Sequence, residues 1–293
     1  VCRGWSFVNN YEFSRKGRIW VLWSPQVRVT PVFKSSQIIT VSVLLEGEQE
    51  EFFCSFVYAE NIAEQRKELW EDIKSHQDSA MFRNKEWIIM GYFNEILEVA
   101  EHSNYQEAGV MTAGMKEFES VVQHCHFTDM SYQGPKFTWC NRRDEGIVCK
   151  KLDRILVNEA WLHKRTQAYC VFEAGGCSDH LRGRFHLKSE AIGKRRPFKF
   201  TNAVAEMPEF LQAVGDFWKD KQPLFQSTSA LFRFSKTLKA LKPLIRSLSK
   251  KKLGDLTKKV KEAYQELCER QEETLKQPTH VNIQRELQAA ERW

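Results

Sequence analysis

Short runs of β-branched and aromatic residues dominate the N-terminal part of the chain. Separated by turns, they predict consecutive strands at residues 19–23, 27–33, 38–45 and 52–58. After these strands, the spacing of the apolar residues changes to that of a helix. From Asn61, a candidate N-cap, to about His76 the apolar residues recur at helical spacing among charges. A strand at 87–90 and a helix at 112–124 are expected to follow.

Further apolar runs predict strands at 137–139, 152–157, 170–172 and 184–187, separated by clusters of Gly, Asn and Asp. About eight strands with helices between them indicate an α+β fold, specifically a two-layer α/β sandwich flanked by helices. We expect this domain to cover residues 1–192. Its first residues already read as structured sequence, so we expect it to be truncated at its N-terminus.

The composition changes after residue 192. A polar, basic linker is expected at 193–204, and a helical, basic region at 205–293, with helices at 206–218 and 227–276. Between Arg233 and Lys261 there are eleven Lys or Arg residues and one acidic residue, Asp255. This basic stretch could bind the phosphates of nucleic acid, with Arg246, Lys250, Lys251 and Lys252 as candidates, or it could be a solvated helix face.

The 293-residue chain has a formal net charge of +6 and a sequence pI near 8.8, which favours polyanionic partners. Its eight cysteines are too sparse for a disulfide scaffold. No apolar run approaches the roughly 20 residues that a membrane-spanning helix needs. We therefore expect an intracellular protein, nuclear or cytoplasmic, with no membrane partner.

A zinc site is a competing interpretation, because Cys140, Cys149, Cys170 and Cys177 fall within one stretch and His124 and His126 flank Cys125. Their spacing contains no CxxC pair of the kind that structural zinc sites usually show. Core cysteines are the favoured interpretation.

Several motifs, in this order and spacing, resemble the endonuclease of plant LINE-type (non-LTR) retrotransposons, a member of the exonuclease–endonuclease–phosphatase superfamily. They are Phe56–Asn61, Gly91–Leu97, Glu101–Ser103, Phe137–Trp139, Lys151–Arg154 and Cys177–His180. The tail from Lys199 resembles the connector towards a reverse transcriptase. The resemblance implies a reverse transcriptase domain in the same polyprotein and DNA as the partner.

The resemblance also implies Mg²⁺-dependent phosphodiester hydrolysis, in which a hard cation is held by oxygen ligands. Asp179 matches a residue that handles metal or water. His180 would contact the phosphate while Asp153 holds its tautomer. Asn94 would position phosphate and water, and Tyr58 would donate its hydroxyl to a phosphate oxygen.

Tyr92 departs from the family pattern, which places an aspartate there to orient or deprotonate the attacking water. A phenol with a pKa of about 10 is neutral near pH 7 and cannot act as that base. The resemblance also implies that the family's early asparagine and its metal-binding glutamate are to be expected upstream of Val1, so neither is assigned to a residue here.

Three hypotheses follow. The first is a retroelement-derived endonuclease-like domain with impaired catalysis. The second is an active Mg²⁺-dependent, DNA-nicking endonuclease when full length. The third is a non-catalytic remnant that binds nucleic acid through the basic helix.

Overall fold

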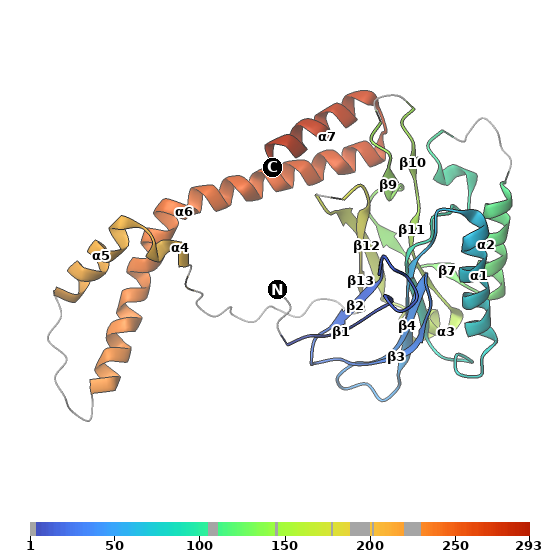
Figure 1. Cartoon of the computed structure of the whole chain (residues 1–293), viewed down its shortest axis with the longest axis horizontal. Helices are drawn as coiled ribbons and strands as arrows, with labels where there is room; N and C mark the ends of the chain where they lie inside the picture. Colours follow the sequence, from blue (N-terminus) through green and yellow to red (C-terminus); the bar gives the residue numbers. More distant parts are fainter. Residues whose placement is uncertain are drawn as a thin grey trace. The chain divides into compact units, whose positions relative to one another are not determined.

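A computed structural model of the chain describes residues 4–104, 111–143, 146–176, 178–187, 200, 202–219 and 230–293, without the side chains of 230, 232, 233, 236 and 250–257 (Figure 1). The chain divides into two compact units. One comprises Val1–Glu190 with Leu267–Arg292, and the other comprises Ala191–Glu266 with Trp293.

The first unit is built on a six-stranded sheet in the order β3-β4-β5-β6-β11-β7. Its strands are β3 (Arg28–Lys34), β4 (Ile38–Leu44), β5 (Phe52–Tyr58), β6 (Trp87–Tyr92), β11 (Asp153–Val157) and β7 (Thr128–Asp129). All neighbours are antiparallel except β5 and β6, which run parallel. The helix α1 (Ala63–Asp78) supplies the crossover between those two strands, as a parallel pair requires.

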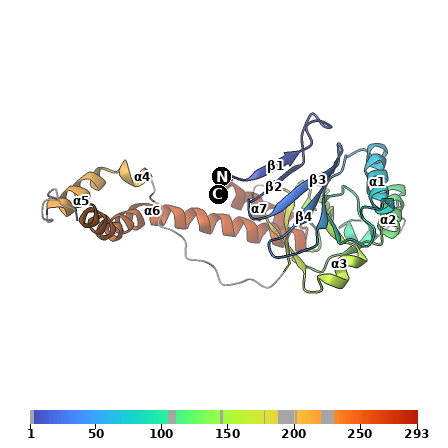
Figure 2. The same ribbon diagram turned by 90° about the horizontal axis from the view of Figure 1, so that it is seen from below.

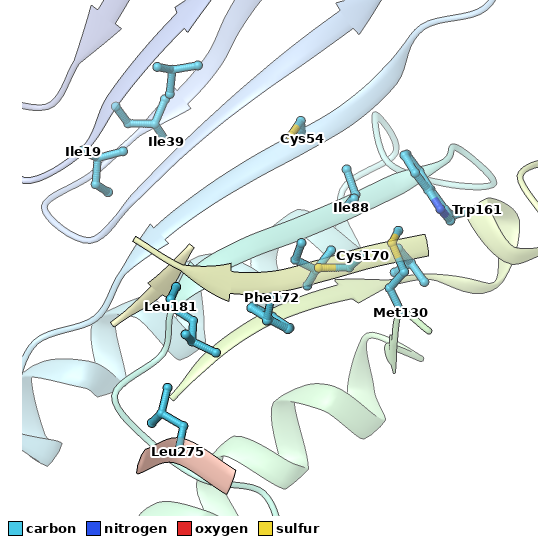
Figure 3. Close-up of a cluster of buried hydrophobic side chains, with 14 of the residues drawn as sticks. Ile19, Ile39, Cys54, Ile88, Met130, Trp161, Cys170, Phe172, Leu181 and Leu275 are labelled. Carbon is cyan, nitrogen blue, oxygen red and sulfur yellow. The ribbon is translucent and has the colours of Figure 1, made fainter. Parts of the chain in front are cut away.

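A smaller sheet in the order β13-β12-β8 forms part of the second layer. Two hairpins accompany it, β1 with β2 and β9 with β10. The strands are β8 (Tyr132–Gln133), β12 (Tyr169–Ala174), β13 (Leu181–His186), β1 (Ser6–Asn9), β2 (Trp20–Trp23), β9 (Trp139–Cys140) and β10 (Cys149–Lys150). Figure 3 shows side chains of the core between the layers, with Ile39 and Ile88 from the large sheet and Phe172 and Leu181 from the small one.

Helices cover the other face of the large sheet. α1 and α2 (Ala113–His124) lie side by side there, as both views show (Figures 1 and 2). A second core forms beneath them, in which Trp70 stacks on Phe118 with ring centroids 4.9 Å apart. The 3₁₀ turn η1 (Val99–Glu101) and α3 (Glu159–Lys164) complete this part. Multi-strand sheets flanked by helices confirm the predicted α+β sandwich.

The last helices of the chain also belong to the sandwich unit. α6 (Ala230–Lys276) enters it at Leu267, and α7 (His280–Arg292) lies within it. Leu275 of α6 and Ile283 of α7 are buried in the core between the sheets. This grouping differs from the expected division, which placed all of residues 205–293 in one separate region, because apolar residues at helical spacing in 267–289 are buried against the strands.

The second unit contains α4 (Asn202–Ala205), α5 (Pro208–Lys219) and the N-terminal part of α6. Trp218 of α5 stacks on Phe234 of α6, with ring centroids 6.2 Å apart. Most of the linker expected at 193–204 lies outside the described residues. Among the residues that are described, no helix is long and apolar enough to span a membrane.

Candidate active site

Three central strands of the large sheet bring candidate residues together at one end of the strands. Tyr58 ends β5, Tyr92 ends β6, and Asp153 begins β11. The strand register pairs Tyr58 with Tyr92 and Tyr92 with Asp153. Residues far apart in sequence thus lie in one row, and the phenol ring of Tyr92 occupies the middle position.

His180 approaches this row from the loop before β13. Its Nδ1 lies 2.8 Å from Oδ2 of Asp153, forming a partly buried ion pair. Burial alone would lower the pKa of His180, but the hydrogen bond and charge of Asp153, aided by Asp179, outweigh it and raise that pKa. The pair therefore favours the imidazolium, a donor suited to a phosphate oxygen.

A threonine and a tryptophan hold the Asp153–His180 pair, called the dyad below, and the loop before β13 in place. The fully buried Thr138 hydroxyl accepts the backbone amides of Leu152 at 3.0 Å and Asp153 at 2.9 Å, which fixes the start of β11. The indole Nε1 of Trp139 donates to Oδ2 of Asp179 at 2.9 Å. A backbone bridge between Trp139 and His180 ties the two segments together.

Tyr92 packs directly on the dyad. Its ring meets the His180 ring edge to face, with centroids 4.9 Å apart, and lies 5.3 Å from the ring of Tyr58. Burial, followed by the nearby Tyr58 and Asp153, raises the pKa of Tyr92 to about 12. The hydroxyl at this position is therefore a weaker candidate for a base catalyst than an ordinary phenol, because almost none of it is ionised near neutral pH.

Gly91 allows β6 to carry Tyr92 to the edge. Its φ is +136°, and a Cβ there would lie 2.1 Å from the carbonyl oxygen of Val57 on the neighbouring strand. Only glycine fits such a close approach of two backbones. The glycine of the motif is thus required by the sheet, whatever residue follows it.

Tyr58 and Asn94 make contacts of different kinds. The guanidinium of Arg18 lies over the Tyr58 ring, 4.8 Å from its centroid, and pairs with Glu60 at 3.5 Å. Asn94 follows β6 with a φ of +53°, and its Nδ2 donates to the Glu60 carbonyl and to Oδ1 of Asn61. The Asn61 side chain is thereby bound to Asn94, and Ile62 occupies the N-cap of α1 without a capping side chain.

Few metal donors converge on this site among the described residues. No group of three or more His, Cys, Asp or Glu side chains capable of holding a metal occurs among the described residues. One oxygen of Asp153 is bound by His180 and one oxygen of Asp179 by Trp139, while Glu95 is paired with Arg66 at 2.8 Å. Asp179, the expected magnesium ligand, therefore belongs to no such cluster within the part of the chain that the structure describes.

The sequence-predicted residues fall into distinct groups. One group makes a series of direct contacts and consists of Tyr58, Tyr92, His180 and Asp153. Asp179 precedes His180 in the chain. Asn94 instead binds the turn before α1. Arg246 lies in the second unit. The side chains of Lys250, Lys251 and Lys252 lie outside the described part of the chain, and so does Cys177 of the last motif.

Sequence reasoning missed the supporting roles of Thr138 and Trp139. Both belong to the motif Phe137–Trp139, so the signal was present, but nothing local shows that the threonine hydroxyl would accept amides from β11. Cys140 and Cys149 face each other across β9 and β10 as free, buried thiols. No metal-binding group is formed around them in the described residues.

In fold, the chain resembles a solved endonuclease domain. The endonuclease domain of TRAS1, a telomere-specific non-LTR retrotransposon, matches with a TM-score of 0.51 at 14% sequence identity, over 64% of this chain and 82% of that chain. An endonuclease/exonuclease/phosphatase family protein from Bacteroides thetaiotaomicron matches with a TM-score of 0.41 at 11% identity, over 64% of this chain and 77% of that chain. No family model and no curated protein matches the chain.

Proposed function

We propose that this chain is a retroelement-derived, endonuclease-like domain whose hydrolysis of phosphodiesters is impaired. The proposal is supported by the likeness of fold to the endonuclease domain of TRAS1 and by the Asp153–His180 dyad, which, with Trp139 and Asp179 beside it, offers groups that suit a phosphate. The helical C-terminal region, which resembles a connector towards a reverse transcriptase, is consistent with the same origin.

The position of Tyr92 carries this proposal. It stands between Tyr58 and Asp153 in the row of strand ends, where the resemblance expects a base. Its half-buried phenol, with a pKa of about 12, stays neutral and fills the space beside His180. Loss of one acid–base group commonly costs about 10²- to 10⁴-fold in rate. Magnesium is implied by the resemblance, and in the described part of the chain no group of three or more His, Cys, Asp or Glu side chains forms a dedicated site for it.

Nicking of supercoiled plasmid by the purified chain in the presence of Mg²⁺ tests the proposal. We expect the parent protein to nick no faster than its Asp179→Ala and His180→Ala variants, each shown to be folded by circular dichroism. Nicking by the parent that disappears in both variants would overturn the proposal and establish an active endonuclease, which is the second hypothesis. A preparation of Tyr92→Asp, run in parallel, reports whether a carboxylate at this position raises the rate.

Binding of nucleic acid without cleavage is a second candidate function, favoured by the charge of α6. The basic stretch 233–261 lies on this helix, and among its described side chains Lys239, Arg246, Lys259 and Lys261 are exposed. Cations along a helix bind a phosphate backbone without sequence preference. DNA is therefore the proposed partner of this stretch.

A further inference from the structure

The C-terminal helices bind the backbone of the loop that carries Asp179 and His180. Gln271, on the part of α6 that belongs to the sandwich unit, is 3% exposed. Its Oε1 accepts the amide of Gly176 at 3.0 Å, and its Nε2 donates to the carbonyls of Gly176 at 2.8 Å and Ser178 at 3.1 Å. One amide side chain therefore satisfies three backbone groups of this loop.

A second contact comes from α7. Glu286, 4% exposed, accepts from Nε of Arg142 at 2.7 Å. Arg142 in turn donates through Nη2 to the carbonyl of Ser178 at 2.7 Å. The carbonyl of Ser178 thus receives donors from both Gln271 and Arg142, immediately before Asp179.

Apolar packing accompanies these polar contacts. Leu275, one turn beyond Gln271, and Leu181, next to His180, are 5% and 6% exposed in the same core cluster. Figure 3 shows Leu275 on its helix segment below Leu181. Because Gln271 and Leu275 lie four residues apart, one face of α6 presents both the polar and the apolar contact.

Trp139 and Thr138 form other hydrogen bonds with this segment. The Trp139 indole donates to Asp179, and the amide of Leu181 donates to the carbonyl of Thr138 at 2.7 Å. The loop lies between these hydrogen bonds and those of Gln271. If the Gln271 side chain is removed, three polar backbone groups are left without its hydrogen bonds and the loop is less restrained relative to Trp139.

We propose that Gln271 is a positioning residue of the candidate active site and that the C-terminal helices, residues 267–292, hold the Asp179–His180 loop in register with Asp153. The region expected to be a connector separate from the endonuclease-like domain therefore supplies part of the support of its site. This inference concerns the site of the proposed function but does not depend on hydrolysis.

The test uses the full chain and the Trp139 indole N–H resonance in a proton–nitrogen correlation spectrum. Asp179→Ala removes the indole's acceptor and defines the resonance position of the unbound indole. In Gln271→Ala we expect the resonance to move towards that position, and amide hydrogen exchange of residues 174–181 to accelerate about tenfold or more, the effect of losing roughly one hydrogen bond. Gln271→Glu, which keeps the acceptor for Gly176 but loses both donated bonds, should give an intermediate shift.

Gln288→Ala, an exposed glutamine on α7, is the matched control and should leave both readouts at the parent values. An unchanged Trp139 resonance in Gln271→Ala would overturn the proposal. So would exchange that accelerates equally in β6 and in residues 174–181, because that is general destabilisation. Plasmid nicking by the parent would overturn the proposed function but leave this inference standing.

Discussion

Tyr92 and Asp153 are direct partners across β6 and β11, so the residue at which the resemblance implies an aspartate is adjacent to the carboxylate that orients His180. A carboxylate at position 92 would place a second negative charge beside Asp153. Tyr92 instead places a neutral ring against His180. The Asp153–His180 dyad is thus assembled beside a neutral ring and not beside a second carboxylate.

The Asp153–His180 pair should make stability depend on pH. The folded-state pKa of His180 is raised above its ordinary value, mainly by Asp153 acting against burial. The contribution of the pair is therefore complete below about pH 6.5, the unfolded value, and is lost as pH rises through the higher folded-state pKa. We expect Asp153→Asn to destabilise the protein more at about pH 5.5 than at about pH 8.5.

Urea unfolding of the parent and of Asp153→Asn at both pH values provides the measurement. A difference between the two proteins that is the same at both pH values would contradict the prediction. His163→Gln, which removes an exposed histidine paired with Glu159, is the control and should show little pH dependence of its effect.

Thr138 should contribute to stability through its hydroxyl alone. Thr138→Val keeps the shape of the side chain but removes the acceptor of the Leu152 and Asp153 amides. We expect a loss of about 1–3 kcal/mol in the free energy of unfolding, because these amides lie at a buried position. Thr138→Ser retains the hydroxyl and should recover most of the loss in the same urea titration. A Thr138→Val variant as stable as the parent would mean that the hydroxyl acceptor does not matter.

The strands with long apolar runs were predictable from sequence, and the pairings that build the site were not. β3, β4, β5 and β6 stand out because β-branched and aromatic residues fill them. β7, β8, β9 and β10 have two residues each, too few for a periodic signal. That β11 lies between β6 and β7 follows from contacts distant in sequence, and only this order makes Tyr92 the neighbour of Asp153.

The residues that support the site were also harder to predict from sequence than the residues of the site itself. Ordered motifs pointed to Tyr58, Asp153 and His180, and the structure brings these together with Tyr92. Gln271 lies in a charged helix where a glutamine has no distinguishing pattern. Its role arises from tertiary packing of Leu275 and Ile283 into the sandwich, and the helical spacing of these apolar residues does not indicate which strands they pack against.

A buried ion cluster behind the site should be far more important to stability than a surface pair. Arg154 has a fully buried side chain and binds both Glu101 and Asp129. Glu101→Gln leaves that guanidinium short of negative charge, and we expect a loss of about 3–5 kcal/mol in the free energy of unfolding. Glu71→Gln breaks an exposed pair with Lys74 and should cost no more than about 1 kcal/mol. Similar losses for both variants in chemical denaturation would contradict this interpretation.

If the basic stretch of α6 binds DNA, its exposed lysines should contribute through charge. We expect the double variant Lys259→Gln, Lys261→Gln to bind a fluorescein-labelled duplex more weakly than the parent. The slope of log affinity against log salt concentration should shrink by about 0.9 for each phosphate that the variant no longer neutralises. Lys85→Gln, Lys116→Gln removes two exposed lysines from the sandwich and is matched in charge. The measurement is fluorescence anisotropy over a series of salt concentrations. Equal weakening of DNA binding in both double variants would assign binding to the net charge of the protein. A parent slope near zero would exclude binding through phosphates.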